Sequence, residues 1–416
     1  MSNLKSCLRA VFACACTVAL LTTANANEPT DMMEQELRSD AVHAWRYFER
    51  KSAALPGITA PNIWLEDEGE VGSYDIVTMW DVGSIILATV SARSLDIIDG
   101  ETFDIRVRGI LDFLKKAAYT TKSGAIPNFR SKTDTAKSVE AGYDATDTGR
   151  LFIALHVLDK ATDGKYNISD LFSRWAIDST IRNGTISDIK DGAIISAESN
   201  IYRYYVSRGY SLWSCKHENS YSGALPGTSD AATSAFLDEL GRIGPIATEP
   251  SAAEVVELGA SPFSTAILGV LGKRQQTRFD ETGKLTSVSE TPIDRAPWFT
   301  YQGLDLTQDG EAAWTVYPYH TEKRWAKPSF ASENRIVNSK AAFLWLAVEP
   351  SEYTKKVWKY VREKARSNKY GFHPGVYEAT EKPVTNIDLN TNAAILEAAA
   401  YILKGRTPLS DQKVGL

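Results

Sequence analysis

The apolar residues of this chain recur at the spacing of an α-helix along almost its whole length. Strand-like alternation is scarce, and residues 284–288 are the best short candidate. No Pro- or Gly-rich linker divides the chain, so we expect a single all-α domain. The expected helices, about twelve in number, cover residues 32–53, 81–95, 103–118, 147–158, 171–181, 201–212, 231–240, 252–258 with a further apolar run to 271, 339–347, 352–365 and 391–403.

A faint internal repeat indicates how these helices are arranged. YDIVTMWDVGSIILATV from Tyr74 is similar to YDATDTGRLFIALHVL from Tyr143, and NSKAAFLWLAV from Asn338 and NTNAAILEAAAYIL from Asn390 are looser copies. In each copy an Asp or Asn precedes an apolar helix, where it can cap the free backbone N–H groups. Buried helices alternating with amphipathic ones predict an (α/α)6 toroid, with an incomplete or irregular ring allowed; an α-solenoid is the rival architecture.

The first residues have the composition of a signal peptide. Lys5 and Arg9 precede an apolar stretch at residues 10–21, and Ala24-Asn25-Ala26 has the A-x-A form of a cleavage site. We therefore expect residues 1–26 to be removed, residues 27–416 to form the toroid domain, and the protein to be periplasmic or secreted from a bacterium. A retained membrane anchor is the alternative, but the apolar stretch is too short to favour stable membrane insertion.

The composition of residues 27–416 limits the classes of ligand that we expect the protein to bind. The net charge of −6 becomes more negative once Lys5 and Arg9 are lost, which argues against nucleic acid as a partner. Cleavage also leaves Cys215 as the sole cysteine, and the few His and Cys residues lack metal-ligand spacing, so neither a metal nor another cofactor is expected. Many of the 10 Trp and 18 Tyr lie in polar loops, as expected for surfaces that stack on sugar rings.

A toroid would gather the starts of its inner helices at one rim, and the polar residues found there are the candidate binding residues. Asp and Asn at these starts are explained equally well as helix caps. Tyr377-Glu378 lies too far upstream of its helix to be a cap. The expected ligand-binding residues are Trp80, Asp81, Asp147, Trp298, Tyr301, Tyr377, Asn390 and Asn392.

Five segments in order give the chain a family resemblance: MWDVGSIILA, TDTGRLFIAL, YYVSRGYSLW, IDRAPWFTY and GVYE with NTNAAILEA. They resemble a bacterial domain-of-unknown-function family, DUF3131, which is related to glucoamylase-like toroids including the endo-β-1,2-glucanases. The resemblance implies a carbohydrate-active enzyme. Because the family is often found beside glycosyltransferases, a glycosyltransferase or an export system is a candidate protein partner. One departure is Thr291, where family members often have Asp after Ser-Glu.

Hydrolysis of a glycosidic bond needs one carboxylic acid and a second carboxylate. In glucoamylase-like toroids the acid lies in the loop between the fifth and sixth helices and the base in the loop before the twelfth. This analogy implies Glu198 as acid and Glu378 as base, and an inverting mechanism, with Glu249 and Asp294 in reserve. The ordinary alternatives are a surface loop for Glu198 and Glu378, a first-turn residue for Glu249, and a salt bridge to Arg295 for Asp294.

Two functions of different classes follow. The first is a glycoside hydrolase that cleaves a bacterial glucan or a related polysaccharide. The second is a non-catalytic glycan-binding or export-assisting protein with the same cleft. A lyase would need a basic cleft, and the acidic rim disfavours one.

Overall fold

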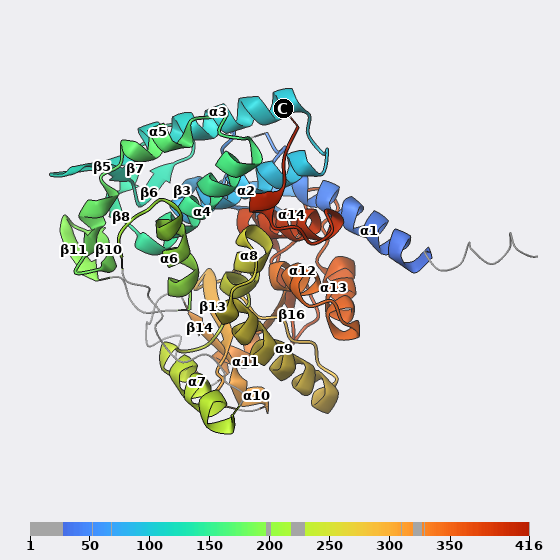
Figure 1. Ribbon diagram of the computed structural model, residues 1–416. Coiled ribbons are helices and arrows are strands. Elements are labelled where there is room, and N and C mark those ends of the chain that lie inside the picture. The colour runs from blue at the N-terminus through green and yellow to red at the C-terminus, as the bar shows by residue number, and fades with distance from the viewer. Residues whose placement is uncertain are drawn as a thin grey trace, which may run out of the picture.

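The computed structural model describes residues 28–51, 53–67, 69–196, 201–217, 229–308, 310–318, 327 and 329–415 (Figure 1). Within them, almost all buried apolar residues belong to one core that extends from Leu37 to Val414. In this part of the chain, no helix is both long and apolar enough to cross a membrane.

Helices that are buried over most of their surface form the centre of the molecule. Each contacts the next along the chain, and the last contacts the first. In chain order they are α2 (Met79–Ser94), α4 (Ala145–Ala161), α6 (Arg203–Leu212), α8 (Glu249–Leu258), α12 (Ser339–Val348) and α14 (Leu389–Leu403). Of these, α2, α4, α12 and α14 are apolar nearly all round, so they need cover on every side.

Amphipathic helices lie outside this set, as Figure 1 shows for α1, α3, α9 and α13. In α13 the buried residues Tyr353, Val357, Trp358 and Val361 recur at helical spacing and pack on α12. The outer helices are α1 (Glu28–Trp45), α3 (Gly100–Lys116), α5 (Ile168–Ser173), α7 (Asp230–Ile243), α9 (Pro262–Thr282) and α13 (Glu352–Lys364), and α10 (Gly310–Ala313) and α11 (Phe330–Asn334) are short. The expectation of a mainly helical chain is therefore confirmed.

Short strands, which the all-α expectation left out, connect the helices. They form the sheets β17-β1-β2, β3-β6-β7, β4-β5, β12-β13-β14 and β15-β16, and β10 pairs with β8, β9 and β11. Residues 284–288 are extended but belong to no strand. The strands are β1 (Asn62–Glu66), β2 (Gly69–Tyr74), β3 (Ile76–Thr78), β4 (Ala118–Thr121), β5 (Gly124–Pro127), β6 (Arg130–Lys132), β7 (Ser138–Glu140), β8 (Gly142–Tyr143), β9 (Ile181–Arg182), β10 (Thr185–Lys190), β11 (Ala193–Ser196), β12 (Thr291–Pro292), β13 (Phe299–Leu304), β14 (Trp314–Pro318), β15 (Ile336–Asn338), β16 (Gly375–Tyr377) and β17 (Asn386–Asp388).

Four of these strands lead directly into central helices, and the residue at each junction caps the helix. Thr78, Asp144, Asn338 and Asp388 accept a hydrogen bond from the backbone N–H three residues later. Only Asn338 was expected as a cap. Asp81 and Asp147 lie three residues after the true caps, and Asn390 lies two residues after Asp388. The side chain of Asp81 still belongs to the cap of α2, because it accepts the backbone N–H of Thr78 in a capping box.

The glycine of the repeated Asp-x-Gly motif lets the central helices pack closely. A Cβ on Gly149 would lie 2.4 Å from Cβ of Val206, and one on Gly209 would lie 2.2 Å from the carbonyl oxygen of Gly149. A larger side chain at either position would push α4 and α6 apart.

Candidate active site

The helix starts of α2 and α14 bring Asp81 and Asn390 together. Oδ1 of Asp81 accepts a hydrogen bond from Nδ2 of Asn390 at 2.9 Å, and its Oδ2 accepts one from the N–H of Thr78 at 2.9 Å. Burial raises the pKa of Asp81, while the hydrogen bonds from Thr78 and Asn390 oppose that rise. This carboxylate is thus held in a fixed orientation at the rim.

A second group, the carboxylate pair of Asp144 and Asp147, lies at the neighbouring start of α4. Oδ1 of Asp144 accepts the N–H of Asp147 at 2.8 Å. Burial raises the pKa of Asp147 well above its ordinary value, and the charges of Asp144 and Asp81 raise it further. The negative charge of Asp144 therefore favours the protonated form of the Asp147 side chain.

Glu249, Glu290 and Lys340 form a third group, at the starts of α8 and α12. Oε2 of Glu249 accepts a hydrogen bond from Oγ of Ser289 at 3.1 Å and forms an ion pair with Nζ of Lys340. Burial raises the pKa of the half-buried Glu290 to about 7; Lys340 opposes this rise and Glu249 adds to it. Burial also lowers the pKa of Lys340, but Glu249 and Glu290 outweigh that effect and leave it raised.

These three groups lie at the starts of different central helices. In the succession of contacts, α8 and α12 lie on the opposite side from α2 and α4. The charge of Glu290 contributes to the raised pKa of Asp147, so the two carboxyl groups lie close enough to interact. The arrangement offers a partly protonated carboxyl group at neutral pH and other carboxylates near it, which is the equipment for acid–base catalysis.

Trp80 lies between these groups, over a buried ion-pair network. Its ring is 4.8 Å from Cζ of Arg150. Arg150 donates to Oε1 of Glu257 at 2.7 Å, to the Tyr205 hydroxyl at 2.7 Å and to Oε1 of Glu397 at 3.1 Å. The side chains of this ion-pair network are nearly inaccessible to solvent. The network therefore supports Trp80 and is not itself available to a ligand.

Several buried polar atoms at this rim have no hydrogen-bond partner within the described part of the chain. They are Nε1 of Trp80, Oδ1 of Asn390 and Oδ2 of Asp388. Buried polar atoms are nearly always satisfied in folded proteins. A hydroxyl-rich ligand would supply both donors and acceptors for them.

Glu378 does not belong to the carboxylates at the starts of the central helices. Glu378 accepts from Nη2 of Arg278 at 2.8 Å, and Lys284 and Arg335 lie 3.9 Å from its carboxylate. Arg278 and Arg335 also bind Glu311. Glu378 is thus a member of an ion-pair cluster beside α9. Glu198 lies outside the described residues.

The side chains of Tyr377 and Asp294 bind each other and neighbouring residues. The Tyr377 hydroxyl donates to Oδ1 of Asp294 at 2.8 Å, and Cζ of Arg295 lies 4.3 Å from the Tyr377 ring. Oδ2 of Asp294 accepts from the N–H of Thr385 at 2.8 Å. Tyr377 is buried, so its ring offers little surface to a sugar.

Asn392 is fully buried and its amide is used within the fold, because it exchanges hydrogen bonds with the backbone of Phe372 and donates to the carbonyl of Asp388. In contrast, Trp298 and Tyr301 are exposed, at 57% and 41%. They are the two expected stacking residues with surface available to a ligand.

Sequence reasoning missed Asp144, Glu290, Lys340 and Asp388. Asp144 is part of the repeated Tyr-Asp pair, which was a usable signal. Glu290 belongs to the Ser-Glu pair before Thr291, which was also a usable signal, whereas no sequence signal shows that Lys340, inside an apolar helix, pairs with Glu249.

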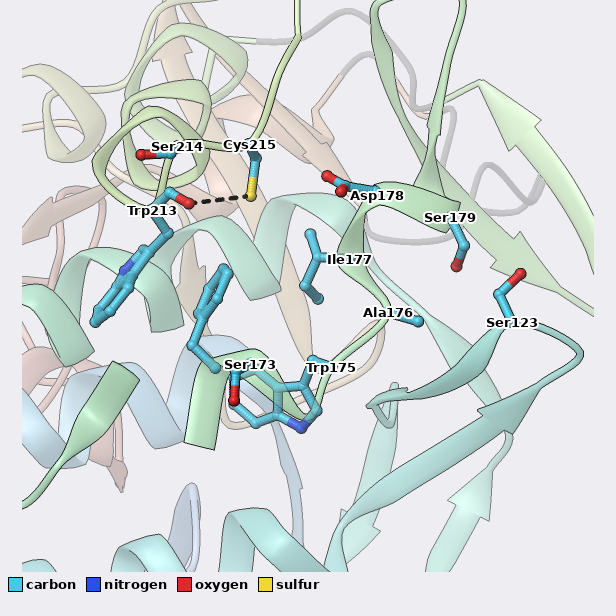
Figure 2. A pocket seen from close by; sticks show the side chains of 11 residues that line it. Ser123, Ser173, Trp175, Ala176, Ile177, Asp178, Ser179, Trp213, Ser214 and Cys215 are labelled. Atoms are coloured by element: carbon cyan, nitrogen blue, oxygen red, sulfur yellow. Dashed lines mark hydrogen bonds between the residues drawn. The ribbon is translucent and has the colours of Figure 1, made fainter. Parts of the chain in front are cut away.

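A separate cavity of about 550 Å³ lies near the C-terminal end of α6, away from the helix starts. Figure 2 shows Trp213, Ile177, Trp175 and Cys215 around it. Burial raises the pKa of the Cys215 thiol to about 12, so this thiol stays protonated and is a poor nucleophile.

Comparison with known families agrees with the resemblance seen in the sequence. The model for a protein family of unknown function, DUF3131, matches residues 39–405. The chain belongs to this family. No protein among the curated sequences matches it.

Solved structures with the same fold include enzymes that act on sugars. An endo-β-1,2-glucanase from Chitinophaga pinensis, in complex with sophorotriose and glucose, has a TM-score of 0.61 at 14% identity over 91% of this chain and 94% of that chain. A Bacteroides caccae protein named provisionally as a glucoamylase has a TM-score of 0.59 at 12% identity, over 92% and 94%. Cellobiose 2-epimerase from Spirochaeta thermophila has a TM-score of 0.53 at 11% identity, over 92% and 99%. The DUF3131 chain thus has a glucoamylase-like fold that hosts more than one sugar chemistry.

Proposed function

We propose that this DUF3131 protein is a glycoside hydrolase that cleaves a glucan at the rim of an (α/α)6 toroid. One observation carries the proposal: Glu290, with a pKa raised to about 7 by burial, lies close enough to Asp147 at the start of α4 for its charge to raise the pKa of Asp147. A glycosidase needs a protonated carboxyl group and an ionised one on either side of the scissile bond.

The roles follow from the raised pKa of Glu290 and from the hydrogen bonds that orient Asp81. Glu290 is the general acid that protonates the leaving oxygen. Asp81, whose carboxylate is oriented by Asn390 and Thr78, is the general base that activates water on the opposite face of the sugar. Asp147, whose raised pKa favours the protonated form, donates a hydrogen bond to a sugar hydroxyl. Attack by water from the side opposite the acid inverts the anomeric configuration.

The proposed substrate is a neutral β-linked glucan. The acidic rim would repel a polyanion, whereas aromatic rings and hydrogen-bonding groups suit glucose units. The similarity to an endo-β-1,2-glucanase makes linear β-1,2-glucan the first substrate to test. In keeping with the signal-peptide pattern of residues 1–26, the reaction would take place in the periplasm or outside the cell.

The test is incubation of purified residues 27–416 with a panel of linear glucans, followed by measurement of new reducing ends. Cleavage by the wild-type chain, lost in Glu290→Gln, supports the proposal. The expected pairing of Glu198 with Glu378 remains a distinct proposal, and Glu378→Gln tests it in the same assay. Glucan binding without any cleavage would favour the non-catalytic glycan-binding function instead.

A further inference from the structure

The β13–β14 hairpin carries a face of exposed aromatic residues. Tyr301 and Tyr317 lie directly opposite each other in the strand register and are 41% and 50% exposed. Phe299, two residues before Tyr301, lies on the same face, with its ring centroid 5.4 Å from that of Tyr301. Trp298, just before β13, is 57% exposed. Phe299, Tyr301 and Tyr317 thus share one face, and Trp298 is exposed at the start of the same hairpin. Exposed aromatic surface of this kind is typical of a binding site.

The other face of the same hairpin is fixed to the core. Nε2 of Gln302 donates to the carbonyl of Asn334 at 3.0 Å, and its Oε1 accepts from Nε1 of Trp314 at 3.3 Å. The backbone of Trp298 is held too, because its N–H donates to Arg295 at 2.7 Å and its carbonyl accepts from Ile293 at 3.0 Å. The aromatic face is therefore rigid, so a ligand would lose little affinity through ordering it.

The strand register joins this face to the candidate active site. Thr291 of β12 pairs with Thr300 of β13 in antiparallel register. Extending this register by one residue places Glu290 opposite Tyr301. The Glu290 side chain then lies on the same face of the sheet as Tyr301. Tyr301 is also close enough to Tyr202 to affect its pKa, and the Tyr202 ring lies edge-on to Trp80 with 5.3 Å between centroids. These two observations place the hairpin near Tyr202, which in turn contacts Trp80.

We propose that the hairpin residues Trp298, Tyr301 and Tyr317 form a platform that binds the glucose units of a glucan beyond those at the scissile bond. The inference rests on the proposed function and adds that the protein prefers long chains to disaccharides. Flat rings with hydroxyl groups at the edge match the apolar face and polar rim of successive glucose units. Glucan is the expected ligand because this aromatic face lies next to Glu290, the proposed general acid.

The test compares the affinities of a long linear β-1,2-glucan and of sophorose, measured by calorimetry in the Glu290→Gln background to prevent turnover. Trp298→Ala and Tyr317→Ala should each weaken binding of the long glucan by about 2- to 10-fold, since an aromatic contact contributes about 0.5–1.5 kcal/mol. The ratio of long-chain to disaccharide affinity should fall accordingly. Tyr317→Phe keeps the ring and should retain most of the affinity.

Tyr166→Ala is the matched control, because Tyr166 is a half-buried tyrosine beyond the C-terminal end of α4. It should leave the affinity ratio unchanged. If the wild-type chain cleaves glucan but the two platform variants keep the ratio, the platform is wrong and the proposed function stands. If the wild-type chain neither binds nor cleaves any glucan, both proposals fall.

Discussion

The pH dependence of Glu290 gives the sharpest prediction about the chemistry. Burial in the rim, reinforced by Glu249 and opposed by Lys340, raises the pKa of Glu290 to about 7. A general acid acts in its protonated form, so activity is present below this pKa and lost as the pH rises through it. Between pH 6 and pH 8 the protonated fraction falls from about 0.9 to about 0.1, so turnover should fall about 10-fold.

Two variants test whether Glu290 and Lys340 cause this loss of turnover at high pH, the alkaline limb of the pH profile. Glu290→Gln keeps the shape of the side chain but has no acidic proton, and should lose about 10²–10⁴-fold in turnover, equivalent to about 3–5 kcal/mol in the barrier. Lys340→Met removes the cation that lowers the pKa of Glu290, so the alkaline limb should move to higher pH. It also leaves Glu249 buried without its partner, so thermal unfolding must show that the variant is folded at the assay temperature.

The assay is initial-rate release of reducing ends from linear β-1,2-glucan between pH 5 and pH 9. The reasoning is refuted if turnover is flat across this range, or if the limb of the folded Lys340→Met variant stays where it is in the wild-type chain. Full activity in Glu290→Gln would equally remove Glu290 from the mechanism.

Three further predictions concern other parts of the chain. Intact-mass analysis of exported protein should show a mature chain starting near Asn27, and retention of residues 1–26 would contradict the signal-peptide interpretation. Arg150→Met should lower the free energy of unfolding by about 3–5 kcal/mol, because it strands the buried Glu257 and Glu397; denaturant unfolding measures this, and a loss below about 1 kcal/mol would mean that the network adds little stability. Glu378→Gln should retain most turnover, because Glu378 is held by Arg278 beside α9, whereas a loss of about 10²–10⁴-fold would restore the expected pairing with Glu198.

Much of the fold could be predicted from the sequence because the helices are long and strongly periodic. The central helices α2, α4, α12 and α14 begin within two residues of the predicted starts. The caps of α2, α4 and α14 were placed two or three residues too late. In these helices an Asp or Asn also occupies the first turn, and composition alone does not distinguish the two positions. The short strands were missed because runs of two to six residues show too little alternation.

The candidate site was harder to predict, because its residues meet through tertiary contacts. Glu378 and Arg278 are a hundred positions apart, and nothing around GVYE shows that an arginine will occupy its carboxylate. The same holds for Tyr377 with Asp294. Glu290 is brought to the rim by pairing between β12 and β13, which no helical pattern reveals. The exposure of Trp298 and Tyr301 could be predicted because aromatic residues outside the helical pattern have no helical face to bury; their role in binding stays a prediction.

The most direct test of the account is the action of the purified 27–416 chain on linear β-1,2-glucan, followed by proton NMR of the first products. The account predicts new reducing ends of inverted anomeric configuration, formed by the wild-type chain and not by Glu290→Gln. Products that retain the configuration, or equal cleavage by both chains, would contradict the proposed roles of Glu290 and Asp81. Absence of cleavage across the whole glucan panel would contradict the assignment as a glycoside hydrolase.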